Sequence, residues 1–102
     1  MNELIKLSAR EAVARLKAGE VSPLELIDAA LERIEQTDPL INALPTLCVE
    51  RARENAQEIM ARTKGDEPPG YLHGLPIAIK DLTDVAGVRT TYASPIFADH
   101  VP

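Results

Sequence analysis

The chain has 102 residues, of which 45% are hydrophobic and 26% charged, and its formal net charge is −5. This length allows one small domain at most, and this composition excludes a wholly disordered chain. The negative charge argues against a nucleic-acid-binding surface, which needs clustered Lys and Arg. No apolar run approaches the roughly 18 residues of a membrane span. Since the first residues also lack a signal-peptide pattern, we expect a cytoplasmic protein.

Two helices are predicted in the first third of the chain. Ser8 and Ser22 are each followed three positions later by a glutamate, the pattern of a capping box at a helix N-terminus. The apolar residues that follow recur with a helical period and predict helices over about 8–18 and 22–36. The second helix also has a proline at its first position, and Pro39 is expected to lie beyond its end.

The middle third predicts one more helix, preceded by a short extended segment. Residues 41–48, interrupted by Pro45, are interpreted as a brief or edge strand. Cys48, the only cysteine, lies in an apolar run and is expected to be a small buried hydrophobe, and a single cysteine excludes a disulfide within the chain. Periodic apolar residues then predict a helix over about 50–63, followed by a loop at 65–70.

The last third begins with an apolar run that predicts a strand over about 76–80, buried on both faces. Such a strand belongs in the middle of a layered sheet, yet the 102 residues offer at most one more convincing strand to pair with it. The predicted fold class is therefore α/β with an incomplete sheet, the opening part of something longer.

The apolar run ends in a polar pair, Lys80 and Asp81. In open α/β sheets, ligands bind beyond the carboxyl ends of the strands, which is where this pair is expected. A lysine there is partly removed from water, which disfavours its charged form, so it can act as a general base or attack a carbonyl. The alternative is that Lys80 extends into water and pairs loosely with Asp81 or Asp84.

Other polar residues of the last third give weaker signals. The hydroxyl-rich segment 90–94 is expected to satisfy backbone groups in an irregular loop, and Ser94, which precedes a proline, is interpreted as a turn residue. His73 and His100 lack the spacing of metal ligands, so no metal site is predicted. The glycine spacings fit no phosphate-binding loop, so no cofactor is predicted.

From His73 to Thr90 the chain reads HGLP-x-x-x-KD-x-x-D-x-x-G-x-x-T, which resembles the first block of the amidase signature family. Members of this family hydrolyse or transfer carboxamide groups. With the N-terminal helices included, the resemblance covers the chain from about Ser8 onward. It implies a mixed-sheet α/β/α fold, of which residues 1–102 would be the N-terminal part, with its helices and first strands.

The resemblance also implies a Ser–cis-Ser–Lys triad, in which Lys80 is the catalytic lysine and Asp81 supports it by ordering the lysine loop. Neutral lysine would accept a proton from the bridging serine, which in turn deprotonates the serine that attacks the amide carbonyl. The serines of the family lie in a downstream Gly- and Ser-rich block, and no such block occurs in these 102 residues. The chain is therefore expected to hold the base without the nucleophile and to be inactive alone.

Two positions depart from the family pattern. Many relatives have a polar residue where this chain has Leu82, and Gly where it has Ala93. Because alanine has a Cβ, the second difference disfavours a backbone with positive φ at that position.

Three functions remain open from the sequence. The first is an amidohydrolase acting on a small-molecule amide, completed by the remainder of the amidase domain or by a second chain. The second is the A subunit of a tRNA-dependent amidotransferase. The third is a non-catalytic helical module that binds a partner, although each N-terminal helix has a single apolar stripe that a core already needs. We expect no direct nucleic-acid contact and no membrane association, and a homo-oligomer is possible.

Overall fold

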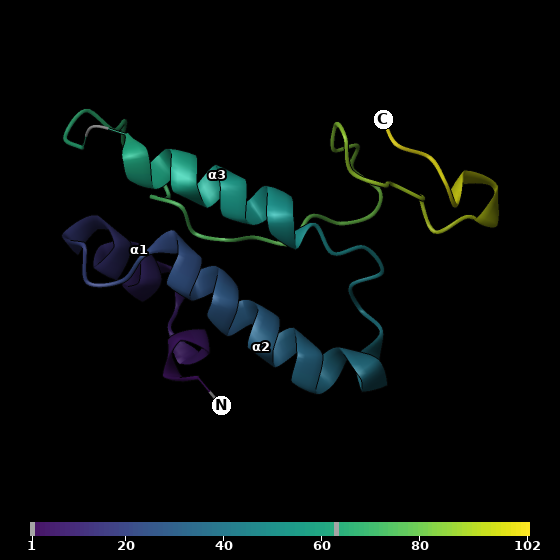
Figure 1. Ribbon diagram of the computed structural model, residues 1–102, viewed down its shortest axis with the longest axis horizontal. Coiled ribbons are helices and arrows are strands. Elements are labelled where there is room, and N and C mark those ends of the chain that lie inside the picture. Colours follow the sequence, from purple (N-terminus) through teal and green to yellow (C-terminus); the bar gives the residue numbers. More distant parts are fainter. Residues whose placement is uncertain (1, 63) are drawn as a thin grey trace.

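The computed structural model describes residues 2–62 and 64–102, and its ordered elements are helices. In chain order these are the 3-10 helix η1 (Glu3–Lys6), the α-helices α1 (Ala9–Ala18), α2 (Pro23–Ile41) and α3 (Val49–Ala61), and the 3-10 helix η2 (Pro95–Phe97). Helix α2 contacts both η1 and α3, and the chain that follows α3 turns back beneath that helix (Figure 1). None of the described helices is both long and apolar enough to span a bilayer.

Local cap chemistry accounts for where α1 and α2 begin. The Ser22 hydroxyl accepts a hydrogen bond from the Glu25 N–H at 3.1 Å, and the Glu25 carboxylate accepts one from the Ser22 N–H at 3.1 Å, which completes a capping box. Ser8 accepts from the Glu11 N–H at 3.1 Å, and no return bond is found among the described residues. Gly19 ends α1 in a left-handed conformation with φ of 75°, which glycine adopts without a Cβ clash.

Helix α2 continues through Pro39, so the prediction that this proline lies beyond the helix is wrong. Proline lacks an N–H and removes one hydrogen bond from the last turn. At the C-terminus of the helix, the Asp38 carbonyl accepts a hydrogen bond from the Asn42 N–H at 2.6 Å, and the Asp38 carboxylate accepts one from the Ala43 N–H at 2.7 Å. Asn42 ends the helix with φ of 54°. Residue 41 is therefore helical, and the segment from 42 to 48 forms a loop and no strand.

Helix α3 packs beside α2 and is linked to it by an ion pair between Arg53 and Asp28, whose side-chain atoms lie 2.8 Å apart. Ala56 is buried. Thr63, where the third helix was expected to end, lies outside the described residues. Cys48 precedes the helix and is exposed, so the expectation of a buried hydrophobe is wrong. Its apolar neighbour Leu47 is exposed as well, so the local run packs against no core.

The hydrophobic core is small and lies around α1 and the start of α2. Its buried residues are Ala12, Leu16, Val21 and Leu26, with Leu4, Leu7 and Leu75 packed against them. The accessible surface is 7368 Å², against roughly 5,700 Å² for a compact monomer of this mass. The radius of gyration is 15.1 Å, against about 13 Å for a compact chain of this length. The chain therefore leaves much of its apolar surface in water.

The described residues contain no β-strand, so the sheet of the predicted α/β fold is not formed in this part of the chain. Ile77 and Ile79 are 67% and 50% exposed. No backbone hydrogen bond involves residues 77–79 in the described chain, and an isolated bridge between Val85 and Val88 is the one β pairing there. A strand requires a neighbour to bond with, and the described residues bring none to this run.

Candidate functional site

Lys80 lies at the end of the extended run, and its side chain is exposed. Its carbonyl accepts a hydrogen bond from the Thr83 N–H at 3.0 Å, which turns the chain. Within the described residues, its ammonium group makes no hydrogen bond or ion pair. The carboxylate of Asp81 bonds to Thr91, and that of Asp84 bonds to Tyr92. The burial that the sequence predicted for Lys80 is therefore absent from this part of the chain, and so is the loose pairing with Asp81 or Asp84.

Asp81 is held by two residues from the far side of the loop. Its carboxylate accepts a hydrogen bond from the Thr91 N–H at 2.8 Å and a second from the Thr91 hydroxyl. Its carbonyl accepts from the Tyr92 N–H at 3.0 Å. The Thr91 hydroxyl, followed by the Thr91 N–H, lowers the pKa of the Asp81 carboxyl below its ordinary value, because both bonds favour the charged form. The residue after Lys80 is thus fixed through its main chain and its side chain.

An aromatic cluster lies beside this contact. The Tyr92 hydroxyl donates a hydrogen bond to Asp84, which raises the pKa of that phenol because the bond favours its protonated form. The Tyr92 ring packs edge-on against Phe97, with centroids 5.1 Å apart, and lies 5.7 Å from the ring of His100. His100 therefore packs among aromatic rings. The cluster ties the segment after Thr91 to η2.

The backbone next to this cluster is unusual, since Tyr92 and Ala93 have φ of 53° and 59°. Alanine was expected to disfavour a positive φ at position 93, yet Ala93 has one. The chain adopts a conformation there that L side chains rarely take. Ser94 follows with its hydroxyl accepting from the Ile96 N–H at 3.3 Å, so it caps η2 as a turn residue.

Two arginines that sequence reasoning missed hold the last third of the chain in place. Arg51 of α3 donates to the carbonyl of Ala86. Arg89 donates to the carbonyl of Ala98 and, at 3.1 Å, to the hydroxyl of Thr46. The only advance signal was that Arg89 lies inside the motif that begins at residue 73. These side-chain hydrogen bonds link the last third of the chain to α3 and to the loop that precedes it.

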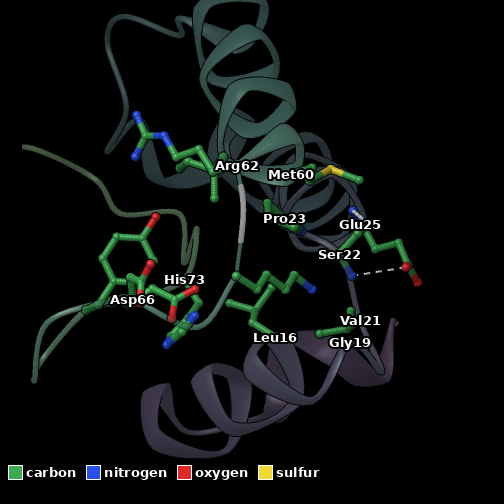
Figure 2. A pocket seen from close by; sticks show the side chains of 14 residues that line it. Leu16, Gly19, Val21, Ser22, Pro23, Glu25, Met60, Arg62, Asp66 and His73 are labelled. Carbon is green, nitrogen blue, oxygen red and sulfur yellow. Dashed lines mark hydrogen bonds between the residues drawn. The ribbon is translucent and has the colours of Figure 1, made fainter.

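The start of the motif lies away from Lys80, in the wall of a depression of about 440 Å³ between the α1–α2 turn and the end of α3 (Figure 2). His73 lines it and packs edge-on against Tyr71, with centroids 4.8 Å apart. Gly74 packs closely on Pro23, the first residue of α2. Lys80 is not among the lining residues. Among the described residues, the depression included, no group of three or more His, Cys, Asp or Glu side chains is arranged to hold a metal.

Comparisons with known proteins give a consistent answer. The family model described as Amidase matches residues 25–102. The chain is 40% identical over 100 residues to the A subunit of the glutamyl-tRNA(Gln) amidotransferase of Carboxydothermus hydrogenoformans, covering 98% of the chain and 21% of that relative. It is 40% identical over 95 residues to an amidase of Pseudomonas putida and 36% identical over 95 residues to an acylamidase of Rhodococcus erythropolis, covering 93% of the chain and 20% of each relative. The chain thus spans about a fifth of the length of these relatives. No solved structure matches it.

Proposed function

The chain belongs to the amidase family, and we propose that it supplies the lysine base of an enzyme that hydrolyses a carboxamide C–N bond. The observation that carries this proposal is the match of residues 25–102, which includes the Lys80–Asp81 pair. One feature of the structure supports it: the residue that follows Lys80 is fixed by Thr91.

In the proposed reaction, neutral Lys80 accepts a proton from a bridging serine as that serine takes the proton of a second, nucleophilic serine. The nucleophile attacks the amide carbonyl. The proton held by Lys80 then passes through the bridging serine to the leaving nitrogen, the C–N bond breaks, and the amine or ammonia leaves. Water then hydrolyses the acyl-enzyme and releases the acid. No Gly- and Ser-rich block that could supply these serines occurs among the 102 residues. We therefore place the serines in the remainder of an amidase domain or on a second chain.

The exposed apolar run that ends at Ile79 is a surface on which the remainder of an amidase domain, or a second chain, could pack. Ile77 and Ile79 are largely exposed, and the backbone between them has no partner in the described chain. A neighbouring strand would satisfy those groups and bury the two side chains, at about 25 cal/mol per Å² of apolar surface removed from water. The same packing would remove Lys80 from water and favour the neutral form that the reaction requires. The sheet of the predicted α/β fold would form at this contact.

The names of the relatives favour a second candidate. One of them is the A subunit of a glutamyl-tRNA(Gln) amidotransferase, and its identity to this chain equals that of the Pseudomonas putida amidase. A chain of this kind would transfer an amide group to a charged tRNA together with partner subunits. Comparing the hydrolysis of simple amides with amide transfer to glutamyl-tRNA(Gln) distinguishes the two, because a hydrolase needs no tRNA acceptor. The cytoplasmic location and the lack of direct nucleic-acid contacts stay predictions.

The proposal is tested by the rate of amide hydrolysis of the enzyme that contains both this chain and the serine-bearing part. Lys80→Ala should lower kcat by at least about 100-fold, the lower range for loss of a general base. The matched control is Lys17→Ala, which removes an exposed lysine from α1. If Lys80→Ala and Lys17→Ala hydrolyse amides at similar rates, Lys80 is not the base. A helical partner-binding module would likewise show no dependence on Lys80.

A further inference from the structure

We infer that Thr91 is a positioning residue for Lys80, acting through Asp81. This inference rests on the proposed role of Lys80 as the base. No described side chain bonds to the Lys80 ammonium group, so the backbone of residues 80 and 81 sets where the lysine side chain begins. Thr91 holds the Asp81 carboxylate, and through that side chain it restrains this backbone from outside the lysine loop.

The contact between Thr91 and Asp81 is buried on the Thr91 side and restrains the Asp81 carboxylate at both of its oxygens. Thr91 is 8% exposed, so its groups have little access to water. Its N–H and its hydroxyl reach different oxygens of one carboxylate, Oδ1 and Oδ2 of Asp81, which sets the orientation of the carboxylate as well as its distance. Hydrogen bonds to an ionised acceptor are roughly twice as strong as bonds between neutral groups. The Tyr92 N–H adds a third bond, to the Asp81 carbonyl.

The neighbouring Thr90 supplies a matched comparison within the same loop. Thr90 is 2% exposed, its hydroxyl donates to the Val88 carbonyl at 3.1 Å, and its N–H donates to the His100 carbonyl at 3.0 Å. Like Thr91, it is buried and donates through both its hydroxyl and its N–H, but it makes no bond to Asp81. A merely structural role for these threonines predicts similar effects at both positions, whereas the positioning role predicts an effect at Thr91 that depends on its hydroxyl.

The test uses two pairs of variants, each differing by one hydroxyl group: Thr91→Ser with Thr91→Ala, and Thr90→Ser with Thr90→Ala. The enzyme that contains this chain and the serine-bearing part is assayed for kcat and KM. A misplacement of the base by about 1 Å costs up to about 100-fold in rate. We expect Thr91→Ala to lower kcat by about 10- to 100-fold with KM changed less than about twofold, and Thr91→Ser to retain kcat within about threefold. The Thr90 pair should show no such difference.

A second measurement separates this inference from the proposed function. Carbon-detected NMR of the 102-residue chain follows the titration of the Asp81 carboxyl, whose pKa should rise toward its ordinary value in Thr91→Ala and stay lowered in Thr91→Ser. Equal kcat in the two Thr91 variants, a loss that falls on KM alone, or equal losses at Thr90 and Thr91 would overturn the inference. If Lys80→Ala keeps its activity, the proposed function fails, while the Asp81 titration still reports whether Thr91 holds that carboxylate.

Discussion

Gly74 gives the sharpest test of how the motif packs against the helices. It has φ of +93°, and a Cβ added there would lie 2.5 Å from Cγ and 2.9 Å from Cβ of Pro23. Real Cβ atoms do not approach heavy atoms this closely, so Gly74→Ala must push the start of α2 and the motif apart. The overlap involves the stiff ring of a proline at the first position of a helix, which has no flexible end that could move aside.

The expected cost has two parts. Placing an alanine at positive φ costs about 1–3 kcal/mol, and forcing extra volume into a packed contact costs about 1–3 kcal/mol more. Gly74→Ala should therefore lower the free energy of unfolding by about 2–6 kcal/mol. Gly70 is the matched control, since it has φ of +83° and nothing within 4 Å of the added Cβ. Gly70→Ala should cost the first part alone.

Urea unfolding of the 102-residue chain, followed by the helical circular dichroism signal, measures both variants. Urea lowers the free energy of unfolding by about 1–3 kcal/mol per molar for small proteins. The midpoint of Gly74→Ala should therefore lie about 1 M below that of Gly70→Ala. Equal midpoints for the two variants would refute the close packing of Gly74 on Pro23.

Three further predictions concern the described contacts. Ala93→Gly should raise the free energy of unfolding by about 0.5–1 kcal/mol in the same urea assay, because relief of the positive φ exceeds the added flexibility of the unfolded chain, and a loss would contradict this. Ser22→Ala should lower it by about 1 kcal/mol through loss of the α2 cap, whereas no change would argue against the capping box. The hydrogen bond from Tyr92 to Asp84 raises the pKa of that phenol above its ordinary 10.0, so its stabilising contribution is present below pH 10.0 and is lost as the pH rises through the folded-state pKa. Absorbance titration at alkaline pH should show Tyr92 ionising later than in Asp84→Asn, and identical curves would exclude the bond.

The helices could be predicted because their signals are local. A serine followed three positions later by a glutamate satisfies the first free N–H groups of a helix within one turn, and Ser22 and Glu25 do this in the structure. The end of α2 could not be predicted in the same way. A proline usually marks the end of a helix, yet α2 continues past Pro39 to Ile41, and Asp38 accepts hydrogen bonds from the N–H groups of Asn42 and Ala43 beyond it.

The strand and the site depended on partners distant in sequence. The run up to Ile79 has the composition of a buried strand, yet a strand forms only beside another, and the described residues bring none to it. The sequence singled out Lys80 and Asp81 as a pair. It gave no sign that Thr91 would hold Asp81. A threonine ten positions away has the same sequence pattern whether its hydroxyl bonds to a carboxylate or to its own loop. Long-range pairing of side chains is therefore what sequence reasoning missed.

The rate of amide hydrolysis by the 102-residue chain, measured with and without the serine-bearing part on material of verified intact mass, tests the central claim most directly. The claim is that this chain contributes Lys80 as a base and lacks the nucleophile. It predicts no hydrolysis above background by the chain alone, and hydrolysis with both parts that is lost in Lys80→Ala. Hydrolysis by the pure chain alone, or hydrolysis that survives Lys80→Ala, would contradict it.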